Sequence, residues 1–66
     1  MTPIEASKLE IGDKVKHEDG TPGSIVEKGY RGIKILWEDG VYGTLYFSGM
    51  SDGDAERLNE VEVVNQ

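Results

Sequence analysis

The sequence predicts a small all-β barrel of five short strands, with a short helical turn before the last strand. The clearest sign is a hairpin, because residues 32–38 and 41–47 alternate apolar and polar side chains on either side of Asp39 and Gly40. The other apolar runs are equally short, and glycines or other turn residues bound them. A chain of 66 residues forms one domain with a thin core, which leaves no room for a deep cleft.

The barrel is expected to occupy most of the chain. Residues 1–8 form an N-terminal extension, residues 9–64 the barrel, and residues 65–66 a short C-terminal tail. Ser7 and Glu10 have the spacing of a capping box, which predicts a single helical turn just before the first strand.

Short turns separate the predicted strands. The turns at residues 18–23 and 29–32 carry glycines, and Pro22 indicates that the second strand starts after it, because proline has no N–H to donate. Gly43 inside the fourth strand predicts a bulge, a device that lets a short sheet curl. Residues 48–54 are mostly small or acidic, so we expect the most mobile loop there. The predicted strands are residues 14–17, 24–28, 33–37, 41–47 and 61–64, and the predicted helical turn is residues 55–59.

Alternation along the strands assigns an inner and an outer face to the sheet. The more apolar side chains should face inward, so Tyr42 and Tyr46 are expected on the outer face. The expected core consists of Leu9, Ile11, Val15, Ile33, Ile35, Trp37, Leu45 and Phe47.

The composition excludes several classes of protein. The chain has no cysteine, so neither a disulfide framework nor a thiolate zinc site is expected. It has no apolar stretch long enough to span a membrane, and residues 1–5 lack the basic and apolar regions of a signal peptide. We therefore expect a cytoplasmic protein that has no membrane contact, no cofactor and no metal site.

Four segments carry a resemblance to a known superfamily. They are residues 11–15, 23–25, 33–40 and 58–61. With the order of strands and the helical turn before the fifth strand, they resemble the SH3-like barrels, in particular the Tudor-like and KOW-like branches. The resemblance covers residues 9–64 and implies a five-stranded SH3-like barrel. Members of this superfamily, which includes many small bacterial and phage-encoded proteins, bind proteins, methylated side chains or nucleic acids, so the resemblance implies a binding module.

The aromatic side chains form the first candidate site. Three outward tyrosines beside Leu36 and Val26 would make an apolar patch rimmed by charge, which is typical of a protein contact. Two cations next to these tyrosines would steer an acidic segment of the partner. The predicted protein-binding residues are Tyr30, Tyr42, Tyr46, Leu36, Arg31 and Lys34.

A methyl-lysine cage is a narrower interpretation of the same tyrosines. The resemblance to Tudor-like domains implies it, because ring faces attract a quaternary ammonium group. Trp37 would join the cage if it faced outward, and Asp39 or Asp52 would supply the counter-charge. Residues 18–23 contain no aromatic residue for the cage wall that such domains commonly draw from this turn.

The charge distribution offers an alternative function. The net charge of −6 opposes phosphate binding, yet residues 14–34 hold five cations against three acids. A KOW-like domain would use such cations, with aromatic side chains stacked on bases. The predicted nucleic-acid-binding residues in this alternative are Lys14, Lys16, Lys28, Arg31 and Lys34.

The second half of the chain is acidic, with seven acids against one arginine in residues 38–66. Asp52, Asp54 and Glu56 alternate as calcium ligands do, but the later bidentate glutamate of such loops is missing, so a solvated loop is the expected structure. With Glu60 and Glu62 this surface would otherwise imitate the charge of a nucleic-acid backbone.

Catalysis is not expected. His17 is the only histidine, and no serine or threonine has a recognisable base beside it in the sequence. The sequence therefore predicts a non-catalytic module, a monomer or weak homodimer, that binds another protein through its tyrosines. Nucleic-acid binding by the basic first half is the alternative.

Overall fold

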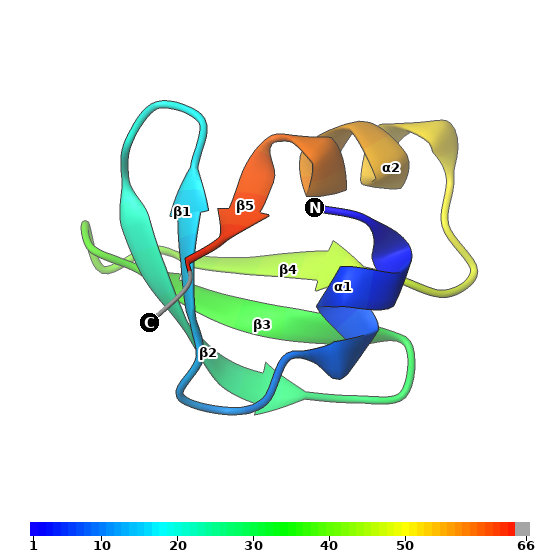
Figure 1. Ribbon diagram of the computed structural model, residues 1–66, viewed down its shortest axis with the longest axis horizontal. Coiled ribbons are helices and arrows are strands. Elements are labelled where there is room, and N and C mark those ends of the chain that lie inside the picture. Colours follow the sequence, from blue (N-terminus) through cyan, green and yellow to red (C-terminus); the bar gives the residue numbers. More distant parts are fainter. Residues whose placement is uncertain (65–66) are drawn as a thin grey trace.

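The computed structural model describes residues 1–64, so the predicted tail at residues 65–66 lies outside the described part of the chain (Figure 1). Seven elements follow one another along the chain. They are α1 (Pro3–Lys8), β1 (Lys14–His17), β2 (Pro22–Lys28), β3 (Gly32–Trp37), β4 (Tyr42–Tyr46), α2 (Asp52–Asn59) and β5 (Val61–Val63).

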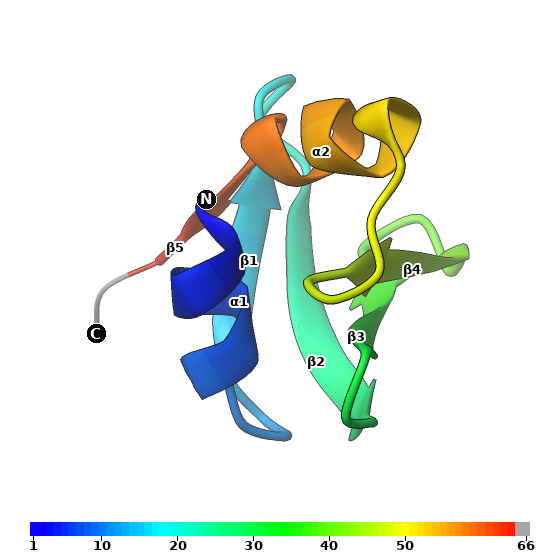
Figure 2. The same ribbon diagram turned by 90° about the vertical axis from the view of Figure 1, so that its right-hand side faces the viewer.

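The five strands form one curled antiparallel sheet in the order β4-β3-β2-β1-β5. Figure 2 shows the sheet bending from β5 and β1 on one side to β3 and β4 on the other, with α2 across the top of the opening. β4 and β5 are the two edge strands of this half-barrel. The predicted fold class, five short strands with a short helix before the last one, is confirmed.

The core lies inside the curl and draws on every element. The predicted inward residues Leu9, Val15, Ile33, Ile35 and Leu45 are buried, and Trp37 and Phe47 are half-buried and pack against them. The prediction for Ile11 is wrong. Its side chain is 67% exposed, because the chain reverses at Gly12 (φ 99°) and leaves Ile11 at the tip of the turn. Four further buried residues complete the core: Ala6, Ile25, Leu58 and Val61.

The first helix begins earlier than the sequence predicts. Its capping box joins Thr2 and Glu5 rather than Ser7 and Glu10, and Pro3 occupies the first helical position, which favours a start there. The backbone N–H of Thr2 donates to Glu5 at 2.8 Å, and this bond lowers the pKa of the Glu5 carboxyl. Ser7 lies in the last turn, where its hydroxyl donates to the carbonyl of Ile4.

The second helix replaces part of the predicted mobile loop. α2 begins at Asp52, inside residues 48–54, and continues through the predicted turn at residues 55–59. Ser51 and Asp54 form its capping box, and the acidic side chains of the first turn interact favourably with the positive end of the helix dipole. An acidic run that resembles a solvated loop is therefore the start of a helix.

The predicted bulge lies in a different strand. β3 and β4 pair without interruption through Gly43, whereas the register between β2 and β3 shifts between Ile25 and Glu27. β2 also begins at Pro22, two residues before the predicted start, because a proline carbonyl still accepts: the N–H of Glu38 donates to it at 3.0 Å.

Gly43 and Gly23 instead make room for Trp37. A Cβ at Gly43 would lie 2.9 Å from Nε1 of the indole, and a Cβ at Gly23 would lie 2.7 Å from its Cε3. Both distances are shorter than a side-chain contact allows. The indole therefore sits on the inner face of the sheet between two strands that carry no side chain at these points.

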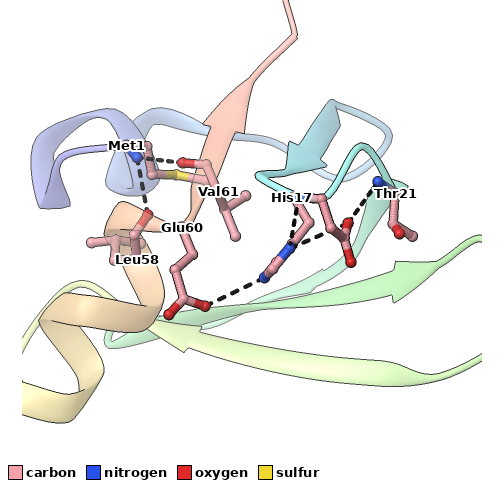
Figure 3. Close-up of polar contacts among 7 residues, drawn as sticks. Met1, His17, Thr21, Leu58, Glu60 and Val61 are labelled. Atoms are coloured by element: carbon pink, nitrogen blue, oxygen red, sulfur yellow. Dashed lines mark hydrogen bonds and ion pairs between the residues drawn. The ribbon is translucent and has the colours of Figure 1, made fainter.

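The N-terminal amino group ties the first helix to the end of the chain. The ammonium of Met1 donates to the carbonyl of Leu58 at 2.9 Å and to that of Val61, as Figure 3 shows. These carbonyls belong to the last turn of α2 and the start of β5, where a positive charge interacts favourably with the helix dipole.

We expect Gly43→Ala to lower the free energy of unfolding by about 1–3 kcal/mol, because the new methyl group overpacks the indole of Trp37. Urea denaturation followed by far-UV circular dichroism measures this loss. In a Trp37→Phe background, Gly43→Ala should lower the free energy of unfolding by a smaller amount, because the part of the ring that carries Nε1 is gone.

Gly29→Ala is the matched control, since the nearest atom to its added Cβ lies 3.9 Å away. If Gly43→Ala lowers the free energy of unfolding no more than Gly29→Ala does, the contact between Trp37 and Gly43 is not tight enough to exclude a methyl group.

Candidate functional site

The β3–β4 hairpin positions the tyrosines on the outer face of the sheet. Its turn is fixed by Gly40 (φ 88°) and by Asp39, whose carboxylate accepts the N–H of Val41 at 3.0 Å. The register places Leu36 opposite Tyr42. The inner row of the same strands is buried, so the alternate side chains face outward. The outer pairs are Leu36 with Tyr42, Lys34 with Thr44, and Gly32 with Tyr46.

All three tyrosines are exposed, as the sequence predicts. Tyr42 is 59% and Tyr46 41% exposed on β4, and Tyr30, in the turn between β2 and β3, is 89% exposed. Large aromatic side chains left in contact with water are typical of binding surfaces. We call Tyr30, Tyr42 and Tyr46, with Leu36, Arg31 and Lys34, the tyrosine face.

Lys34 lies at the centre of the tyrosine face. Its ammonium is 5.4 Å from the ring centroid of Tyr42 and 3.0 Å from a carboxylate oxygen of Glu27. The hydrogen bond to Glu27 and the charge of that carboxylate raise the pKa of Lys34. Lys34 therefore stays charged, but the carboxylate of Glu27 already neutralises part of this positive charge.

The bulge in β2 creates this ion pair. With regular alternation Val26 would lie opposite Lys34, but the shift after Ile25 brings Glu27 opposite Lys34 and Lys28 opposite Ile33. Alternation counted along the sequence therefore gives the wrong face for Glu27, and nothing in the local sequence marks the position of the shift.

Tyr46 and Tyr30 border a shallow hollow on the outer face. A Cβ at Gly32 would lie 3.1 Å from Cδ1 of Tyr46, so the ring lies across the bare backbone of its cross-strand partner. The hollow has a volume of about 420 Å³, and Arg31 and Lys34 add positive charge to its lining. Its shape and charge suit a partner side chain that is acidic or aromatic.

The structure does not join all the predicted contact residues into one cluster. The guanidinium of Arg31 lies close to Gly49, in the segment between β4 and α2, with Nη2 2.8 Å from the place of a Cβ there. Leu36 lines a separate, mostly apolar hollow of about 650 Å³, together with Pro22 and Val64. Arg31 therefore contributes at one end of the tyrosine face and Leu36 at the other.

The five cations of the alternative site are also divided. Lys28 has its ammonium 3.7 Å from the carboxylate of Glu10, and Lys34 pairs with Glu27. Lys14 donates to the hydroxyl of Ser24 at 2.8 Å. Lys16 and Arg31 form no ion pair within residues 1–64.

The methyl-lysine cage that the sequence suggests would add Trp37 and a carboxylate of Asp39 or Asp52 to the tyrosines. Trp37 faces the core side, so it does not lie with the tyrosines on the outer face. Asp39 is engaged in the hairpin turn, and Asp52 lies in the first turn of α2. Trp37 is therefore missing from such a cage, and the carboxylate that lines the hollow beside Tyr30 and Tyr46 is that of Glu27.

The sequence gives no sign of a small cluster around His17. Its side chain is 30% exposed, with Nε2 3.3 Å from Glu60 and Nδ1 3.3 Å from Asp19 (Figure 3). Its ring also meets Trp37 edge-on, with the centroids 5.8 Å apart. Because Glu60 is distant in sequence, only the fold brings the two together.

The protonation state of His17 decides which of its contacts form. In the neutral ring Nδ1 accepts the N–H of Asp19, whereas in the charged ring both nitrogens donate, one to each carboxylate. Asp19 itself is held ionised, because a hydrogen bond from the N–H of Thr21 lowers its pKa and the nearby His17 adds a smaller effect.

Within residues 1–64, no three histidine or acidic side chains lie close enough together to hold a metal ion. None of the helices described there has the length and apolar character needed to cross a membrane.

No family model, curated protein or solved structure matches this chain. Its function is therefore inferred from the surfaces described above.

We expect Glu27→Gln to lower the pKa of Lys34 toward its ordinary value, because the neutral side chain removes the charge that stabilises the ammonium. Titration of the Lys34 side-chain resonances by NMR measures the shift. The raised pKa means that the pair stabilises the fold at neutral pH and that this contribution disappears only as the pH rises through the lysine range.

Glu10→Gln, which removes the carboxylate beside Lys28, is the control and should leave Lys34 unchanged. An unchanged Lys34 pKa in Glu27→Gln would mean that the ion pair does not persist in solution.

Proposed function

We propose that this chain is a non-catalytic interaction module that binds another protein through the tyrosine face. One observation carries the proposal: three tyrosines stand exposed near Lys34 and Arg31, two on the outer face of β4 and one in the turn before β3. Tyrosine and arginine are the side chains most often found at the energetic centres of protein interfaces. The sheet holds the backbone of Tyr42 and Tyr46 in place, so little backbone entropy is lost there on binding.

The charges of the tyrosine face favour an acidic partner segment. Arg31 has no ion pair within the described residues, and Lys34 keeps its charge beside Tyr42. A partner carboxylate that approaches the hollow would meet both cations and compete with Glu27 for Lys34. The resemblance to SH3-like barrels supports the same proposal, since such barrels commonly serve as binding modules.

Nucleic-acid binding is the alternative, and the aromatic and cationic lining of one hollow favours it. Tyr30 could stack on a base while Arg31 contacts a phosphate. Two of the five cations already pair with carboxylates, and the net charge is −6, so few phosphate contacts remain available.

We expect Tyr42→Ala combined with Tyr46→Ala to reduce partner retention about thirtyfold or more, the effect of losing about 2 kcal/mol at an interface hot spot. The measurement is a pull-down from lysate of the source organism at low and moderate salt, with and without nuclease, quantified by mass spectrometry. Both rings are exposed, so the variant should keep its far-UV circular dichroism spectrum.

Ile11→Ala is the matched control, because it removes an exposed apolar side chain that does not belong to the tyrosine face. A protein retained by wild type and by this control, at both salt concentrations and after nuclease, supports the proposal. Retention that is equal in the double variant, or that nuclease or salt removes, would contradict it, and the second result would favour nucleic acid.

A further inference from the structure

A small hollow lies between the middle of β4 and the end of α2, the helix that crosses the opening of the curled sheet (Figure 2). Its volume is about 120 Å³. Because one water molecule takes about 30 Å³ in the liquid, the hollow has room for about four waters or for a ligand of similar size. The residues around it include His17, Trp37, Thr44, Arg57, Glu60 and Val61.

The middle of β4 presents main-chain groups to this hollow. The N–H of Phe47 donates to the carbonyl of Arg31 at 2.9 Å, and hydrogen-bonded positions alternate along an antiparallel ladder. Counted back from Phe47, the N–H and C=O of Thr44 therefore point away from β3, to the side on which the hollow lies. Within residues 1–64 no hydrogen bond from a turn, a loop or α2 reaches these two groups. The hollow thus contains one main-chain donor and one main-chain acceptor that need a partner.

The indole N–H of Trp37 is a second donor at the same hollow. Nε1 lies beside Gly43, which lines the hollow, whereas Cε3 of the ring lies beside Gly23, which lines the separate apolar hollow. Within residues 1–64 this N–H forms no hydrogen bond. No side-chain nitrogen or oxygen in that part of the chain is both buried and unpaired, so Nε1 is accessible to solvent.

Arg57 and Glu60 bring opposite charges to the hollow. They lie about one helical turn apart, a spacing at which such side chains often pair, yet they form no ion pair with each other. Glu60 instead contacts Nε2 of His17 at 3.3 Å, as Figure 3 shows. Arg57 has no ion pair within residues 1–64. The hollow therefore offers two separate opposite charges to a ligand that carries a charge of each sign.

We propose that this hollow binds a free α-amino acid of the size of glycine or alanine. The carboxylate of the ligand pairs with the guanidinium of Arg57, and the N–H groups of Thr44 and Trp37 are further donors to it. The ammonium of the ligand pairs with the carboxylate of Glu60, and the carbonyl of Thr44 is a further acceptor.

The charge of the chain favours a zwitterion over a simple anion. A zwitterion satisfies both Arg57 and Glu60, and it has no net charge for a protein of net charge −6 to repel. The ligand has few atoms, so we expect a dissociation constant in the millimolar range. This site goes beyond the proposed function and does not depend on the tyrosine face.

Titration with glycine up to about 100 mM, followed by two-dimensional ¹H–¹⁵N NMR, tests the proposal. The amide resonance of Thr44 and the indole N–H resonance of Trp37 should shift and saturate together. The amide of Tyr30, which does not line the hollow, should not shift. Acetate and methylammonium, at matched ionic strength, each carry half of the ligand and should bind at least about tenfold more weakly than glycine.

Arg57→Gln and Glu60→Gln each remove one charge from the hollow and keep a polar side chain there. Each should weaken glycine binding at least about tenfold, because a charge-assisted hydrogen bond is lost. Lys8→Gln and Glu56→Gln are the matched controls, since they remove one charge of each sign from residues that do not line the hollow. Both controls should bind glycine as the wild type does.

Leucine tests the size limit, because it carries the same two charged groups on a larger body and should cause no saturable shift. The absence of a saturable shift with glycine and alanine up to about 100 mM overturns the proposal. Leucine or acetate that binds as tightly as glycine also overturns it, and so does undiminished glycine binding by Arg57→Gln. None of these results bears on partner capture, which the tyrosine double variant tests separately.

Discussion

The indole of Trp37 fits inside the curled sheet because the strands on both sides of it carry a glycine at the point of contact. Gly23 on β2 and Gly43 on β4 leave the space that the ring occupies, and neither glycine has a positive φ. The indole packs against the core together with Ile33 and Ile35, which form the inner row of β3. Because strand side chains alternate, this inner row directs Leu36 and Lys34 outward. The tyrosine face is therefore a consequence of how the core is filled.

Much of the fold is predictable from local patterns. The hairpin, the inward row of Ile33, Ile35 and Leu45, and the outward direction of Tyr42 and Tyr46 follow from alternation around a turn dipeptide. The helices are predicted less well, because several capping patterns compete over short distances. Ser51 begins α2 inside a run that is too polar and too rich in glycine to suggest a helix, and the burial of Leu58 adds the packing that the capping box alone does not supply.

The candidate site is predictable only in part. The alternation of side chains along a strand identifies the exposed tyrosines of β4. The ion-pair partner of Lys34, however, depends on a bulge in β2 that the sequence of that strand does not indicate. The contact of His17 with Glu60 depends on β5 returning beside β1, which is a property of the whole sheet. Residue types thus identify which side chains are available for binding, while the pairings that neutralise or orient them arise from tertiary structure.

Trp37 is the only tryptophan of the chain, and this makes it an intrinsic optical probe. Its half-buried ring touches the edge of His17 and shares the small hollow with Gly43 and Thr44. Indole emission responds to the polarity of its surroundings. A single unlabelled fluorescence signal therefore reports on the packing of this ring between Gly23 and Gly43, and so on the closure of the sheet around it.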